Sequence, residues 1–95
     1  MSAGIVMVFI APEGRVIASA SDFGRGGPAG FTQAEAQARR CRDALDYEVF
    51  KALASPALVD ATDSYARAGI VRKMIDNGYR VHAVEVAAAV AGGQR

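Results

Sequence analysis

A run of six apolar residues near the N-terminus, Ile5–Ile10 (IVMVFI), constrains the fold more than any other feature of this chain. The run is rich in β-branched residues and lies between Gly4 and Pro12, which favours a strand over a helix. Side chains of a strand alternate between the two faces of a sheet, so an unbroken apolar run asks for burial on both faces. Because one layer of helices covers only one face, we expect the second face to need a cover.

The segments around this run predict a sheet of three strands. Residues 12–15 (PEGR) place proline and glycine where a tight turn needs them, so residues 16–21 (VIASAS) return as the second strand of a hairpin. Residues 79–86 (YRVHAVEV) alternate around valines and predict the third strand. We expect the first strand to be central, because its apolar character suits a position between two neighbours.

Two helices are expected between the second and third strands. Residues 22–31 form a glycine-rich loop, and a capping box at residues 32–35 (TQAE) starts the first helix. The apolar stripe of this helix consists of Ala34, Ala38, Cys41, Leu45, Val49 and Leu53. The second helix runs from Ser55-Pro56 to a cap at Asn77-Gly78, and its polar residues at 60–64 favour a kink or break.

These elements predict an α+β fold of a single domain, residues 1–95. The sheet is small, three-stranded and mostly antiparallel, the element order is strand, strand, helix, helix, strand, and both helices pack on the sheet. Residues 87–95 are expected to be a frayed C-terminal tail.

Composition excludes several classes of protein. The formal net charge of +1 gives no global field to attract a polyanion. Cys41 is the single cysteine, so no intrachain disulfide forms and a reducing, cytoplasmic location is expected. No apolar segment approaches the roughly 20 residues that span a bilayer, so we expect no membrane partner.

The motifs that could carry chemistry are weak. The glycine-rich loop lacks the spacing of a dinucleotide or phosphate loop, and the Asp22-Phe23-Gly24 match to a kinase signature stands alone. Nothing in the sequence brings Cys41 and His82 together as a nucleophile and base, and a lone histidine makes a poor metal site. We therefore expect no enzyme activity, no cofactor and no metal.

The leading hypothesis is a non-enzymatic module that binds protein, as a homodimer or by docking on a larger assembly. The second sheet face presents either Ile5, Met7 and Phe9 or Val6, Val8 and Ile10, together with alternate residues of the third strand. Exposed arginine and tyrosine residues are frequent interface anchors. The interface is predicted to include Ile5, Met7, Phe9, His82, Val84, Val86, Arg25, Arg39, Arg40, Tyr47, Arg67 and Arg72.

Three further readings follow from the same sequence. A short chain without motifs is typical of small inhibitors from bacterial or phage mobile elements, such as anti-CRISPR proteins, which work by occlusion. A nucleic-acid-associated protein would use the helical arginines, among them Arg39, Arg67 and Arg72. A small enzyme or ligand carrier would use the glycine-rich loop, where a helix N-terminus can hold an anion.

Overall fold

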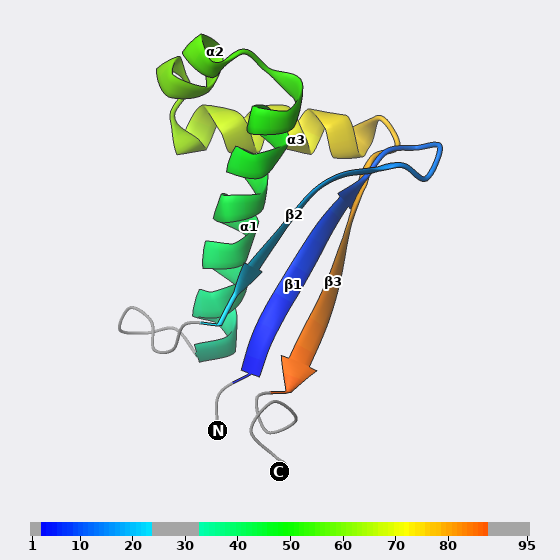
Figure 1. The fold of residues 1–95 in the computed structure, drawn as a ribbon, viewed down its shortest axis with the longest axis vertical. Helices are drawn as coiled ribbons and strands as arrows, with labels where there is room; N and C mark the ends of the chain where they lie inside the picture. The colour runs from blue at the N-terminus through cyan, green and yellow to red at the C-terminus, as the bar shows by residue number, and fades with distance from the viewer. Residues whose placement is uncertain (1–2, 24–32, 88–95) are drawn as a thin grey trace.

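A computed structural model describes residues 3–23 and 33–87 of the chain. Its elements follow the order strand, strand, helix, helix, helix, strand (Figure 1). They are β1 (Ala3–Ile10), β2 (Val16–Asp22), α1 (Gln33–Leu53), α2 (Pro56–Ala61), α3 (Ser64–Asp76) and β3 (Arg80–Ala87).

The sheet has the strand order β2-β1-β3, and both pairings are antiparallel. The β1–β2 hairpin turns at residues 11–15, where Gly14 adopts φ +100° and Ala11 exchanges backbone hydrogen bonds with Gly14 and Arg15. Strand β3 pairs with β1 in uninterrupted register from Ala3↔Ala87 to Ile10↔Arg80. The apolar run is therefore the central strand, as its composition predicts.

The β1–β2 pairing contains a bulge that decides which side chains share a face. Ile10 pairs with Val16, but Phe9 pairs with Ala18, so Ile17 is the extra residue. Beyond the bulge, Ala18 and Ala20 lie on the same face as Phe9 and Met7. Ser19 and Ser21 lie on the opposite face with Val8 and Val6.

The core lies between α1 and the face of the sheet that carries Met7 and Phe9. Both side chains are buried, and they meet Cys41, Leu45 and Val49 from α1. The small residues Ala18 and Ala20 of β2 pack against this cluster, which lets α1 approach the sheet closely. The ring of Phe9 also stacks on Tyr79, with ring centroids 5.5 Å apart.

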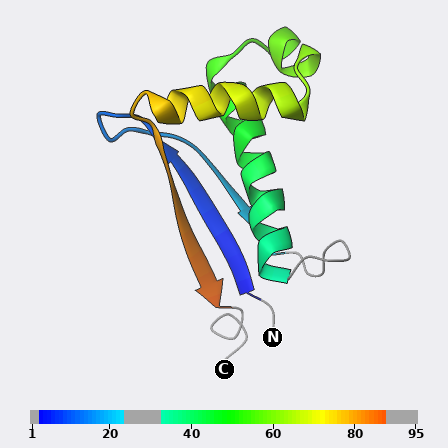
Figure 2. The ribbon, with the colours of Figure 1, turned by 180° about the vertical axis from the view of Figure 1, so that it is seen from behind.

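Helices α2 and α3 each begin at a capping side chain, of which the sequence predicted Ser55 and not Asp63. Ser55 Oγ accepts a hydrogen bond from the backbone N–H of Leu58, and Asp63 Oδ1 accepts one from the N–H of Ala66. Gly78 follows the end of α3 with φ +103°, the left-handed geometry of a helix C-terminus. α3 crosses α1 near the hairpin end of the sheet, and Val71 on α3 is fully buried in the core (Figure 2).

The predicted fold class and element order are confirmed, with one refinement. The helix expected from Ser55 to Asn77 is divided into α2 and α3, because Thr62 and Asp63 have extended backbone and Asp63 caps a new helix. The capping box at Thr32, most of the glycine-rich loop with Arg25, and the expected tail beyond Ala87 lie outside the described residues.

Candidate functional site

One face of the sheet has no helix over it in the part of the chain that the structure describes. Figures 1 and 2 show α1 and α3 on the same side of the sheet, with the opposite side uncovered. We call this second side the open face. Its residues, assigned by strand register, are Gly4, Val6, Val8, Ile10, Val16, Ser19, Ser21, Arg80, His82, Val84 and Val86.

The open face is apolar along its centre and exposed along its flanking strands. Val6, Val8 and Ile10 on the central strand are partly buried by their neighbours. Val16, Val84 and Val86 on the outer strands are 61%, 47% and 38% exposed. Arg80, at one end of β3, is the one residue of these strand positions with a formal charge.

An aromatic ring completes the open face at the far end of the sheet. Phe23 directly follows β2 and is 56% exposed. A Cβ atom added to Gly4 would lie 1.9 Å from the Phe23 ring, so the ring rests directly on the glycine backbone. Gly4 pairs with Val86, which places the ring beside the exposed valines of β3. Sequence reasoning missed Phe23, although a glycine at a strand position signals close approach by another group.

The structure corrects the predicted membership of this surface. Met7 and Phe9 are buried beneath α1, and Ile5 packs against the same core. Val6, Val8 and Ile10 occupy the open face instead, which is the other set that alternation allowed. His82, Val84 and Val86 lie on the open face as predicted.

A groove lies on the other side of the sheet, between α1, α3 and β3. Its volume is about 570 Å³, within the range of ligand and peptide sites. The apolar lining comes from Met7, Ala38, Ala68 and Val81, and the polar lining from Arg39, Arg42, Asp43 and Asp46. We call it the α1–β3 groove.

Asp46 is a buried carboxylate in the wall of this groove. It is 3% exposed, and its Oδ1 accepts a hydrogen bond from Nε of Arg42 at 3.1 Å. Burial raises the pKa of Asp46, and the hydrogen bond from Arg42 opposes that rise. The i,i+4 spacing of Arg42 and Asp46 on α1 alone would suggest a solvated pair, but α3 packs against α1 and the carboxylate is buried.

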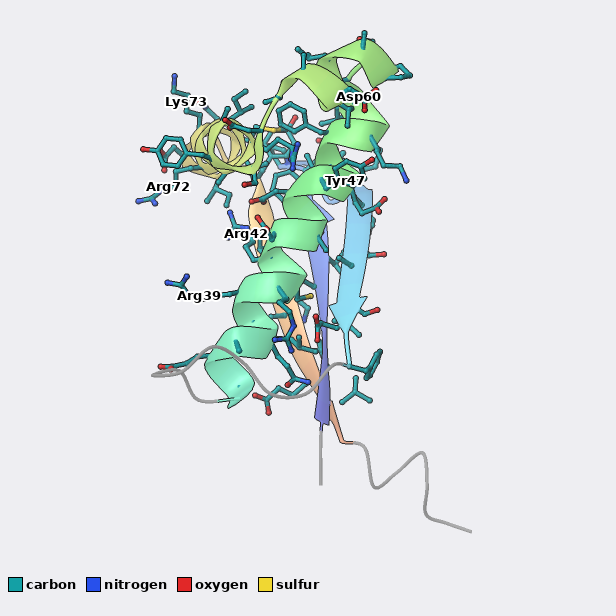
Figure 3. All side chains as sticks on the ribbon, turned by 90° about the vertical axis from the view of Figure 1, so that its left-hand side faces the viewer. Arg39, Arg42, Tyr47, Asp60, Arg72 and Lys73 are labelled. Atoms are coloured by element: carbon teal, nitrogen blue, oxygen red, sulfur yellow. The ribbon has the colours of Figure 1, made fainter. Side chains whose placement is uncertain are left out.

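The arginines of the helices separate into two groups. Arg39, Arg42 and Arg72 lie on the side of the molecule toward β3, as Figure 3 shows. Arg40 instead forms a two-point ion pair with Asp22 at the end of β2, with Nε to Oδ2 at 3.0 Å and Nη2 to Oδ1 at 3.3 Å. Arg40 therefore links α1 to β2 through an ion pair.

Arg67 and Tyr47 also serve contacts within the chain. The Arg67 guanidinium lies 5.3 Å from the centroid of the Tyr47 ring and donates from Nη1 to the carbonyl of Thr62. Its buried Nε has no hydrogen-bond partner among the described residues. Tyr47 remains 40% exposed, and Lys51 approaches the same ring at 5.6 Å. Arg67 thus joins α1 to the segment between α2 and α3.

Cys41 and His82 lie on opposite faces of the sheet. Cys41 is fully buried, and its thiol donates to the carbonyl oxygens of Ala20 and Ile5. Burial raises the pKa of the Cys41 thiol, which keeps it protonated and poorly nucleophilic. The pair therefore does not form a nucleophile and base. Among residues 3–23 and 33–87, no group of three or more potential ligands is placed to hold a metal ion.

A smaller apolar surface lies where the three helices meet. Leu53, Leu58 and Ile70 are each about half exposed around a cavity of about 220 Å³. All of its lining residues are apolar, and Phe50 and Met74 are among them. This volume holds a single large side chain and is below the usual range of small-molecule sites. The open face carries more exposed large apolar side chains, Val16, Phe23, Val84 and Val86 against Leu53, Leu58 and Ile70 here.

Comparison of the chain with protein-family models, with curated proteins and with solved structures finds no match. Within the described residues, none of the helices has the length and apolar character needed to cross a membrane.

Proposed function

We propose that this chain is a non-enzymatic protein-binding module that acts by self-association through the open face. The observation that carries the proposal is the set of exposed apolar side chains on a sheet face that none of the described helices covers, including Val16, Phe23, Val84 and Val86. A contiguous apolar patch of several hundred Å² on a soluble domain usually marks an interface. Its burial is the main favourable free energy available to this surface.

A second copy of the chain is the partner that this face fits. The strand positions of the face carry a single formal charge, Arg80, which lies at one end of β3, so its centre has no buried charge to desolvate. The net charge of +1 adds little repulsion between copies. Two such sheets can stack face to face with their strands roughly 30° apart, so that valines interdigitate around a twofold axis.

The size of the face predicts a weak dimer. Three strands about 4.8 Å apart, rising about 3.3 Å per residue, form a face of roughly 15 by 25 Å. Such a face covers less than the ~800 Å² per partner of a standard interface. We therefore expect a reversible dimer with a dissociation constant of about 1–100 µM, set by the apolar contact.

The test is sedimentation velocity of the wild type across this concentration range, with two variants of β3. Val84→Asp places a carboxylate on the open face and should give a monomer at all concentrations. Ala83→Asp is the matched control: it places the same carboxylate one residue away, at an exposed position on the other face, and should leave the dimer intact. A wild type that is monomeric at several hundred micromolar, or equal behaviour of the two folded variants, refutes the proposal.

Two finer expectations stay predictions. A role as a small occluding inhibitor rests on the size of the chain and its lack of motifs. The cytoplasmic location rests on its single cysteine.

A further inference from the structure

The two ends of the open face carry different side chains. At one end, Ile10 of β1 pairs with Arg80 of β3. At the other end, Gly4 pairs with Val86, and the Phe23 ring lies against the Gly4 backbone. The run of β1 from Gly4 to Ile10 corresponds to about 20 Å along the strand. Within one copy, a cationic residue and an exposed aromatic ring therefore lie at opposite ends of the face.

Arg80 brings its charge to the first end without a partner among residues 3–23 and 33–87. The residue is exposed, and no ion pair or hydrogen bond of its guanidinium group occurs within this part of the chain. By register, its neighbours on the same face are Ile10 and His82. Dimerisation through the open face removes water from this charge, so a favourable contact has to come from the second copy.

The Phe23 ring is the group on the open face that suits such a contact. No carboxylate occurs among the strand positions of the face, so the second copy offers no ion pair there. The ring is exposed, and a guanidinium group is attracted to the face of an aromatic ring within about 6 Å of its centroid. This attraction grows where water is excluded, as it is at an interface. Arg80 of one copy and Phe23 of another are therefore complementary.

Two arrangements of a face-to-face dimer keep the strands of the two sheets aligned. A twofold axis parallel to the strands places like ends of the two faces together and stacks β3 of each copy on β2 of the other. A twofold axis across the strands places unlike ends together and stacks β3 on β3. In the second arrangement, Arg80 of one copy lies over Val86 of the other, beside its Phe23 ring.

Electrostatics favours the arrangement with unlike ends together. With like ends together, both copies of Arg80 would occupy one end of the interface, where the strand positions offer no carboxylate and the two cations repel each other. With unlike ends together, the two cations lie about 20 Å apart and each meets a ring. At that distance their repulsion is largely screened, since the Debye length is about 8 Å in physiological salt.

We propose that two copies stack their open faces with unlike ends together, and that Arg80 of each copy binds the Phe23 ring of the other by a cation–π contact. This inference rests on the proposed self-association and specifies its geometry. The twofold axis produces the contact twice, once at each end of the apolar centre. A partner sheet without a cation and a ring at these positions forms the apolar contact but not the two contacts that fix its orientation.

A double-mutant cycle between Arg80 and Phe23 tests the contact, with the dissociation constant of the dimer measured by sedimentation equilibrium. Arg80→Gln should weaken the dimer about fivefold to thirtyfold, the range for the loss of two cation–π contacts. In a Phe23→Leu background, which keeps an apolar side chain but no ring, the same substitution should change the dissociation constant by less than about twofold. Because the two residues lie about 20 Å apart in one copy, coupling between them arises only across the interface.

Arg72→Gln is the matched control for the loss of charge. It removes an arginine from an exposed position on α3, on the other side of the sheet, and should leave the dissociation constant unchanged in both backgrounds. Circular dichroism checks that each variant is folded. An equal effect of Arg80→Gln with and without the Phe23 ring refutes the contact, and so does an Arg80→Gln dimer as tight as the wild type.

Cysteine cross-linking reports the orientation of the two sheets directly. Ser19 and Ser21 are exposed on the open face of β2, opposite Val8 and Val6. With unlike ends together, Ser19 of one copy faces Ser21 of the other; with like ends together, it faces His82. A mixture of Ser19→Cys and Ser21→Cys proteins should therefore give more mixed disulfide-linked dimer than a mixture of Ser19→Cys and His82→Cys proteins. An equal or reversed yield overturns the proposed orientation.

Failure of the dimer and failure of this contact are separate results. A wild type that is monomeric at several hundred micromolar refutes self-association and the contact together. A wild-type dimer that Val84→Asp dissociates, but in which Arg80 and Phe23 are not coupled, refutes the contact alone.

Discussion

Adjacent residues of β1 should respond very differently to truncation, because they lie on opposite faces of the sheet. Phe9 is fully buried, meets Leu45 and Val49 beneath α1, and stacks on Tyr79. Phe9→Ala should lower the free energy of unfolding by about 3–5 kcal/mol, the range for removal of a buried aromatic side chain. That is a large fraction of the roughly 5–15 kcal/mol typical of a whole domain.

Val8 is the matched position on the open face. It is partly buried between Ser19 and His82, with no helix above it among the described residues. Val8→Ala removes two methyl-sized groups from a partly buried position, so we expect the free energy of unfolding to fall by about 1 kcal/mol. At about 4–8 °C per kcal/mol for a domain of this size, the melting temperature should fall by about 4–8 °C for Val8→Ala and by about 12 °C or more for Phe9→Ala.

The assay is thermal and urea unfolding followed by circular dichroism at about 1 µM protein, where dimerisation adds little to the apparent stability. Phe9→Leu, which keeps most of the buried volume, provides a measurable intermediate if Phe9→Ala does not fold. A loss for Val8→Ala as large as that for Phe9→Ala would refute the face assignment, because it would place the covering helix on the other side of β1.

Three further predictions concern individual contacts. Gly4→Ala should lower the free energy of unfolding by about 1–2 kcal/mol, because the added Cβ meets the Phe23 ring. In a Phe23→Ala background the same substitution should leave the free energy of unfolding unchanged, which a double-mutant cycle measured by urea unfolding would show. Because the pKa of Asp46 is raised in the folded protein, the protonated carboxyl stabilises the fold fully below the ordinary aspartate pKa, and this stabilisation is lost as the pH rises through the folded pKa. The free energy of unfolding of the wild type should therefore fall relative to that of Asp46→Asn from about pH 4 upward. The opposite trend would show that the pair with Arg42 dominates. Cys41 should react with a thiol reagent only at the rate of global unfolding, and fast labelling of the native protein would contradict its burial.

The element order could be read from the sequence because each boundary has a local cause. Gly14 and Gly78 stand where positive φ is required, and Ser55 caps the helix that it precedes. The unbroken run of six apolar residues predicted a central strand, because a strand between two neighbours removes more of these side chains from water than an edge strand does.

The identity of the open face could not be read in the same way. The turn at residues 11–15 would pair Phe9 with Ile17 if the ladder continued regularly, and Ala18 and Ala20 would then share a face with Val8 and Val6. The bulge at Ile17 shifts this pairing by one residue and moves the small alanines beneath α1. The burial of Asp46 escaped sequence reasoning for a related reason, because it depends on how α3 crosses α1.

The central strand receives its second neighbour late in synthesis. Arg80 pairs with Ile10 but is synthesised about 70 residues after it, so the residues of β1 and β2 can meet before those of β3 are available. During that interval the most apolar segment of the chain has an open edge and two uncovered faces, which is the condition that promotes strand-to-strand aggregation. The rate of elongation through α1, α2 and α3 therefore determines how long the nascent chain can aggregate with other nascent chains. Overexpression at high synthesis rates should favour inclusion bodies over soluble protein.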